Sequence, residues 1–197
     1  MTAGGGRLLE RRVSSPSRVL DVVQARLDAV RDGFAEAMGH ELEAMWARKL
    51  GLISPDTALV NELLQLMVLS RVDYTIFFRR LSDIPEDLST LKESFYLPSS
   101  EELDARWMQW LQRWRQRITE AGDIARTSDA MKRTNPKVTW REWLIAPAYE
   151  QAAQGDTSLI QELQAVFSHP YDEQPAELEA KVDRLRPTEF FNAGGVS

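Results

Sequence analysis

The sequence predicts an all-α protein, a multi-helix domain around a hydrophobic core. Along most of the 197 residues, apolar side chains recur at intervals of three and four, which places them on one face of a helix. No stretch alternates apolar and polar residues with enrichment in β-branched side chains, so we expect little or no sheet. With 43% hydrophobic and 27% charged residues, the composition is that of a globular protein able to bury a core.

The first predicted helical segment follows residues 1–16, which contain three consecutive glycines and are expected to form a flexible lead. Gly33 and Gly39 weaken the middle of this segment, so two helices or one bent helix are the alternatives. Gly51 is expected to end it. Its apolar face consists of Val19, Val22, Val23, Leu27, Val30, Phe34, Met38, Leu42, Met45, Trp46 and Leu50.

Two further helices are predicted from caps and apolar stripes. Ser54-Pro55-Asp56 is expected to start the first with a cap and a proline in the first turn. This helix is apolar on nearly every side at its end, which predicts a central position. Asp73 is expected to cap the second, and residues 82–98 are expected to form a loop with one helical turn. The apolar residues are Leu59, Leu63, Leu64, Leu66, Met67, Val68 and Leu69, then Tyr74, Phe77, Phe78 and Leu81.

The clearest helix is expected to open at a capping box formed by Ser99 and Glu102. A linker with a short helical piece is expected up to residue 136. Pro147 is expected to bend the following helix, and Gly155 and Asp156 are expected to separate it from the next one. The apolar faces are Leu103, Trp107, Trp110, Leu111, Trp114 and Ile118; Trp140, Trp143, Leu144, Ala148 and Ala152; and Leu159, Ile160, Leu163, Val166 and Phe167.

The organisation predicted from these elements is one helical domain over residues 17–186. A weak helix is expected within residues 176–185, and residues 187–197 are expected to form an irregular tail. No segment approaches 18 uninterrupted apolar residues and no signal peptide is visible, so we expect neither a membrane span nor secretion. The expected location is the cytoplasm.

Trp107, Trp110 and Trp114 lie on one face of a predicted helix and have two interpretations. They could form a platform on which a nucleotide base or another ligand stacks. We favour a place in the core, because Leu103 and Leu111 share their face. The sequence leaves open whether that core lies within this chain or faces another polypeptide.

Arg106, Arg113 and Arg117 form a second stripe, about a quarter-turn from the tryptophans. They could meet phosphate groups, but we favour arginines that lay their aliphatic stems along the apolar face and keep their charges in water. A net charge of −6 argues against a nucleic-acid partner and against adsorption to an anionic membrane surface.

No metal site can be assigned from the sequence. The chain has no cysteine, which excludes disulfides, thiolate zinc sites and a cysteine nucleophile. His40 and His169 are far apart, and Ala44 stands where a zinc-protease helix would carry its second histidine.

No catalytic or cofactor-binding residue can be assigned either. Glycines 4–6 lack the preceding strand and following Lys-Ser/Thr of a phosphate loop, and no G-x-S-x-G motif occurs. The most site-like segment is Asn135–Lys137, with Arg133 and Arg141 nearby. An asparagine before a proline is also a common device for starting a helix, and both interpretations stay open.

Several segments together resemble the C-terminal part of the selenoprotein O family, also known as YdiU or UPF0061. Their order and spacing across residues 34–175 make the resemblance specific. The segments are Met45–Leu52, Glu62–Met67, Asp73–Thr75, Phe78–Leu81, Met131–Lys137, Ala148–Asp156 and Pro170–Pro175.

The resemblance implies a protein adenylyltransferase with a kinase-like fold that uses ATP and Mg²⁺ or Mn²⁺ to move AMP onto protein hydroxyl groups. The family's ATP and metal residues lie N-terminal to the matched region, so none is carried over to this chain. The expected partner is a kinase-like N-terminal half, without which the chain would be inactive. The alternative is a stand-alone helical domain that binds another protein. Pro147 and the absence of a C-terminal cysteine depart from the family pattern.

Overall fold

The fold is all-helical, as the sequence predicted. The computed structural model describes residues 16–120 and 122–191. Within these residues the only β pairing is an isolated bridge between Val72 and Phe95, and no helix there is long and apolar enough to cross a membrane. Most of the predicted lead, with its three glycines, and residues 192–197 of the predicted tail lie outside the described residues.

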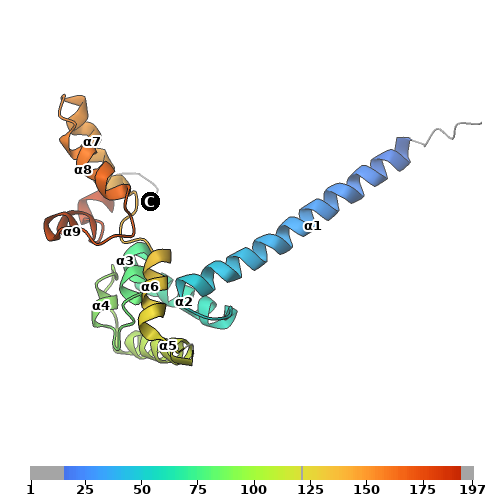
Figure 1. The fold of residues 1–197 in the computed structure, drawn as a ribbon, viewed down its shortest axis with the longest axis horizontal. Helices are drawn as coiled ribbons and strands as arrows, with labels where there is room; N and C mark the ends of the chain where they lie inside the picture. Colours follow the sequence, from blue (N-terminus) through green and yellow to red (C-terminus); the bar gives the residue numbers. More distant parts are fainter. Residues whose placement is uncertain (1–15, 121, 192–197) are drawn as a thin grey trace, which may run out of the picture. The chain divides into compact units, whose positions relative to one another are not determined.

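Nine α-helices and one short 3₁₀ helix make up the described part of the chain (Figure 1). They are α1 (Pro16–Lys49), α2 (Thr57–Ser70), α3 (Tyr74–Leu81), α4 (Ser89–Lys92), α5 (Glu101–Glu120), α6 (Ile124–Thr134), α7 (Glu142–Ala153), α8 (Ser158–Phe167), α9 (Ala176–Val182) and the 3₁₀ helix η1 (Thr188–Phe191).

Helix α1 is continuous, whereas the sequence left open two helices or one bent helix. Gly33 and Gly39 lie inside it, because a glycine weakens a helix by about 1 kcal/mol without ending it. Gly51 ends the segment as predicted, with a φ of +65° that favours glycine. The chain divides into two compact units, residues 1–42 and residues 43–197, so the division falls within α1.

The three tryptophans of α5 lie in the larger of two hydrophobic clusters, here called the large core. This cluster contains buried residues from α2, α3, α5 and α6, and the side chains of Trp107, Trp110 and Trp114 are fully buried. The core interpretation is therefore confirmed, and this core lies within the chain. Each indole N–H has a buried acceptor: the Ser70 hydroxyl at 2.9 Å, the Leu59 carbonyl at 2.9 Å and the Leu50 carbonyl at 2.8 Å, respectively.

A second cluster, here called the small core, forms where α7 packs against α8. Leu163 and Val166 are buried, as the predicted face of α8 requires. Trp140, in contrast, precedes α7 and is 67% exposed, stacked against Phe167 with 4.9 Å between ring centres. The buried members are Val138, Trp143, Leu144, Ala148, Leu163, Val166 and Val182.

Two helices are capped by residues other than the predicted ones. The Asp56 carboxylate, not Ser54, caps α2 by accepting a hydrogen bond from the Leu59 N–H at 3.0 Å. The Ser100 hydroxyl, not Ser99, accepts one from the Leu103 N–H at 3.2 Å at the start of α5. In both places several residues able to cap stand close together, and the chain direction decides which of them reaches the free N–H groups.

Two further expectations hold only in part. The residues expected to be a linker with a short helical piece form α6, an 11-residue helix capped by Asp123; Met131 is its only buried residue, so the sequence carries little apolar periodicity there. Helix α2 does contribute buried residues to the large core, as its predicted central position requires, but at its end Val68 is 76% exposed and Leu69 is exposed as well.

Most of the remaining predictions of helices and caps hold. Helix α9 is present, α4 is the single turn expected in the loop, and Asp73 caps α3 through the Ile76 N–H at 3.1 Å. Pro147 lies inside α7. The tail is not wholly irregular, since η1 occupies Thr188–Phe191.

Candidate functional site

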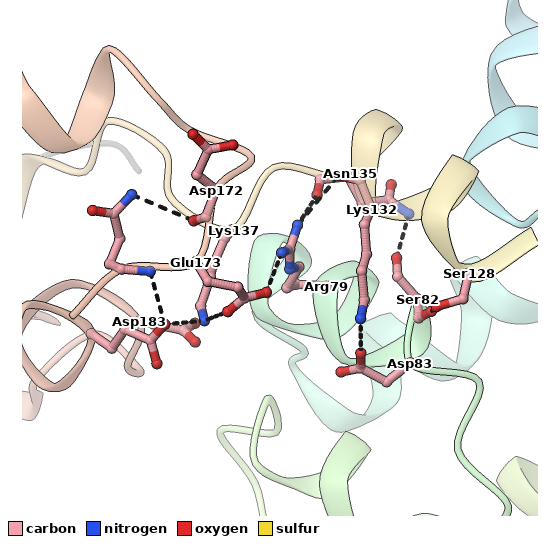
Figure 2. Close-up of polar contacts among 12 residues, drawn as sticks. Arg79, Ser82, Asp83, Ser128, Lys132, Asn135, Lys137, Asp172, Glu173 and Asp183 are labelled. Atoms are coloured by element: carbon pink, nitrogen blue, oxygen red, sulfur yellow. Dashed lines mark hydrogen bonds and ion pairs between the residues drawn. The ribbon is translucent and has the colours of Figure 1, made fainter. Parts of the chain in front are cut away.

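A network of polar side chains, most of them buried, connects the large core with the segments around the small core (Figure 2). The Arg79 guanidinium on α3 lies within 3.3 Å of the Lys132 and Asn135 carbonyl oxygens and 2.5 Å from the Glu173 carboxylate. The Lys137 ammonium contacts the carboxylates of Glu173 and Glu179. We call the set Lys49, Arg79, Ser82, Asn135, Lys137, Glu173 and Glu179 the polar network.

The pairing holds Glu173 in its charged form. Its hydrogen bond from Lys137, together with that from Arg79, lowers the pKa of Glu173 to about 2, although partial burial acts in the opposite direction. Burial lowers the pKa of Lys137, but its bonds to Glu173 and Glu179 outweigh that effect and raise it. Glu173 and Lys137 are therefore both charged near neutral pH and bind each other.

Asn135 occupies the centre of the polar network rather than the start of a helix. It caps the C-terminal end of α6 in an extended conformation, because the following Pro136 disfavours a helical conformation at this position. Its side-chain oxygen accepts a hydrogen bond from the Lys49 ammonium at 2.8 Å. Its side-chain N–H groups donate to the Lys49 carbonyl at 2.9 Å and to the Ser82 hydroxyl at 3.0 Å. The helix-start interpretation was wrong.

Lys49 is buried without a carboxylate partner among the described residues. Its ammonium lies 4.4 Å from the ring centre of Phe78 and 4.8 Å from that of Tyr74, a geometry in which the ring faces attract the cation. Burial lowers the pKa of Lys49 to about 8. The charged form of this lysine is thus less stable in the folded protein than in water.

The pKa of Lys49 predicts a pH-dependent stability. Since the folded pKa of about 8 lies below the ordinary lysine value of 10.5, the unfolded chain binds more protons between these values, and the free energy of unfolding rises with pH there. From pH 7.5 to 9.5 the contribution of Lys49 is expected to rise by about 2 kcal/mol. Urea unfolding across this range measures it as the difference between the wild type and Lys49→Met.

Lys181→Met is the matched control, because Lys181 is an exposed lysine paired with Glu162 at 2.6 Å. It should keep the wild-type pH profile. Identical profiles for Lys49→Met and the wild type would contradict the lowered pKa.

Three ion pairs connect α3 and its N-cap with residues beyond Lys137, and we call them the ionic joint. They are Arg79–Glu173 at 2.5 Å, Arg80–Asp183 at 3.0 Å and Arg141–Asp73, whose two hydrogen bonds both measure 2.9 Å. Asp183, Asp73 and Arg141 are nearly buried. The joint therefore consists of charged groups with little access to water on one or both sides of each pair.

A cavity of about 680 Å³ adjoins the Asp73–Arg141 pair. Aromatic side chains form much of its wall, among them Tyr74, Trp140 and Trp143. Both oxygens of Asp73 and both terminal nitrogens of Arg141 are already hydrogen-bonded to each other. The wall also carries polar groups, among them the hydroxyls of Thr75 and Thr139 and the carboxylate of Glu150, so the cleft combines an aromatic surface with hydrogen-bonding side chains.

The residues singled out in the sequence are only partly brought together. Asn135 and Lys137 join the polar network, Arg141 pairs with Asp73, and Arg133 is exposed. Arg113 and Arg117 pair with carboxylates at the surface beside α2, Glu62 at 2.5 Å and Asp56 at 3.1 Å, which agrees with the flanking interpretation. Within the described residues no group of three or more His, Asp or Glu side chains is placed to hold a metal ion.

Sequence reasoning missed Arg79 and Glu173. They are 94 residues apart, and each stands in a segment whose local pattern indicates only a helix or a turn. The only sequence feature that could have pointed to them is that both lie in segments that carry the family resemblance. Lys49, Asn135 and Lys137 belong to such segments as well.

Comparison with protein families decides the relationship. The family model described as "Protein adenylyltransferase SelO" matches residues 12–168. The chain belongs to the SelO family. Curated SelO relatives named "Protein nucleotidyltransferase YdiU" include that of Ralstonia nicotianae, 34% identical over 167 residues, and that of Xanthomonas axonopodis pv. citri, 36% identical over 163 residues. A third, from Pseudomonas paraeruginosa, is 39% identical over 142 residues.

The alignments cover 79%, 78% and 69% of this chain, but only 30%, 30% and 28% of these SelO relatives, in the same order. The chain thus spans about three tenths of the length of the curated relatives that it matches. The SelO match includes α1 to α8, and so contains most of the polar network.

Proposed function

We propose that this chain is the C-terminal helical segment of a SelO-type protein nucleotidyltransferase, with the family activity of moving AMP from ATP to protein hydroxyl groups. Its contribution is that of a scaffold attached to a kinase-like part. The ATP and the Mg²⁺ or Mn²⁺ ion belong to that other part, and the chain alone is inactive. The location proposed for the complete enzyme is the cytoplasm, where ATP is available.

The observation that carries this proposal is how the conspicuous charged residues are used. Arg79, Lys137 and Glu173 come from segments that carry the SelO resemblance, and the two buried cations both bind the Glu173 carboxylate at the surface of the fold. Phosphoryl and nucleotidyl transfer needs cations directed at the phosphates. Here the cations are directed at carboxylates and carbonyl groups of the same chain, which is the arrangement of a structural support.

The test is an AMP-transfer assay with labelled ATP, Mn²⁺ or Mg²⁺ and a protein acceptor. The purified chain is expected to transfer no label. Addition of the part of the Ralstonia nicotianae relative that lies outside its 167-residue alignment is expected to yield label on the acceptor above the level given by that part alone. Robust transfer by the chain alone would overturn the proposal.

A second candidate is a stand-alone helical domain that binds a protein partner without catalysis. The exposed apolar residues of α1 favour it, because large exposed apolar patches mark interaction sites. A kinase-like reading frame next to this gene favours the enzyme segment, whereas unrelated neighbours favour the interaction domain. In either case the acidic net charge of −6 favours a protein partner over a nucleic acid.

A further inference from the structure

Helix α1 presents an uncovered apolar face within residues 20–42. Seven large apolar side chains of the face are exposed, Val30 to 71% and Phe34 to 66%. At 100° per residue they lie within about 120° of the helix circumference. They are Leu20, Val23, Leu27, Val30, Phe34, Met38 and Leu42.

Such a face is unusual for a helix that stays alone in water. Most helical stability in proteins comes from packing of an amphipathic face, and residues 20–42, taken by themselves, form a single helix with nothing among them that covers this face. Arg31, which lies within the face, contacts Asp28 at 3.1 Å and Asp32 at 3.2 Å on its own helix. With Glu41 it is one of two charged residues within the face, which is otherwise mainly apolar along its length of about 33 Å.

A second copy of this chain fits the face poorly. In a parallel pair with Leu20, Leu27 and Phe34 at equivalent core positions, Arg26 of one copy would lie opposite Arg31 of the other, and like charges at these positions oppose pairing. From Phe34 onward the apolar residues recur every four residues, which departs from the 3.5-residue repeat of a coiled coil. With this spacing the apolar face turns gradually around the helix axis, which suits packing against the surface of a globular partner.

The comparisons indicate which polypeptide supplies that surface. The SelO match begins at residue 12 and so includes the whole face. The relatives are much longer than the matched region, which makes up 30% of the Ralstonia nicotianae protein and leaves about 70% without a counterpart here. A SelO protein thus carries this helix together with a large amount of further polypeptide.

We propose that the apolar face of α1 is the docking surface for the part of a SelO protein that has no counterpart in this chain. This inference rests on the proposed function, because it identifies the kinase-like part as the occupant. The contact is made by the side chains from Leu20 to Leu42 and holds the helical segment against its catalytic companion.

The experiment mixes the purified chain with the part of the Ralstonia nicotianae relative outside the 167-residue alignment, and measures complex formation by light scattering and the dissociation constant by titration. A complex with one copy of each polypeptide is expected, with slowed amide exchange in residues 20–42. Val30→Glu is expected to weaken binding at least tenfold. Val22→Glu is the matched control. Val22 is 55% exposed, and although the sequence pattern counted it with the apolar face, at 100° per residue it lies about 140° from the centre of the seven exposed side chains. Its substitution should leave binding unchanged.

Both variants should retain the wild-type tryptophan fluorescence, since all six tryptophans lie beyond residue 42. Absence of a complex, equal effects of the two variants, or self-association of the chain that Val30→Glu abolishes would each overturn the docking proposal. A complex sensitive to Val30→Glu but without AMP transfer would refute the proposed function alone. AMP transfer that is insensitive to Val30→Glu would refute the docking surface alone.

Discussion

Trp110→Ala is expected to lower the free energy of unfolding by about 4 kcal/mol, because replacing a buried aromatic residue by alanine costs about 3–5 kcal/mol. Trp110 is fully buried between Trp107 and Trp114, with ring centres 6.1 Å and 6.0 Å away. The substitution leaves a cavity at the centre of the large core and removes the donor to the Leu59 carbonyl. Urea unfolding followed by circular dichroism measures the loss.

Trp140→Ala is the control, because the same side chain is removed from a site that is 67% exposed. Its effect is expected to stay below about 1 kcal/mol, as is usual for surface substitutions away from special features. If the two variants lost equal stability, Trp110 would not occupy the core as described.

Gly51→Ala is expected to destabilise the protein by about 3 kcal/mol. A Cβ atom at this position would lie 2.6 Å from Thr127 Cγ2 and 2.8 Å from Met131 Sδ on α6. The φ of +65° adds strain for any residue with a side chain, about 1 kcal/mol, and overpacking a core contact adds about 1–3 kcal/mol. Thermal and urea unfolding of the purified variant give the value.

Gly155→Ala separates these two contributions. Gly155 also has a positive φ, +92°, but a Cβ atom there would meet nothing within 4 Å. Its substitution is expected to cost only the backbone strain, about 1 kcal/mol. A Gly51 variant no less stable than the Gly155 variant would show that α6 does not pack closely against the end of α1.

The sequence predicted elements well wherever burial produces a strong period. The stripe of Trp107, Trp110, Trp114 and Ile118 predicted α5, and all four side chains are fully buried. Helix α6 was predicted only as a short helical piece within a linker, because Met131 is its only buried residue and packing leaves almost no mark on its pattern. The exposure of Val68 was missed because an apolar residue in a helical pattern is interpreted as buried, although many apolar residues lie at the surface.

The polar network was predictable only as a set of isolated residues. Asn135 and Lys137 were noticed because a proline stands between them, but their partners Lys49 and Glu173 lie 86 and 36 residues away. Such contacts depend on how helices pack in three dimensions, and no local period or cap encodes them. Pro136 did carry local information, since it ends α6 and thereby directs the Asn135 side chain inward.

The two cores and the ionic joint between them respond to dissolved salt in opposite ways. Sulfate and similar ions are excluded from protein surfaces and so strengthen the burial of apolar groups within each core. The same ions screen charges, and the Glu173 side chain is 64% exposed where it meets Arg79. Rising ionic strength thus makes each core firmer while loosening its connection to the other. The connection between the two cores is thus electrostatic, whereas the stability of each core is hydrophobic.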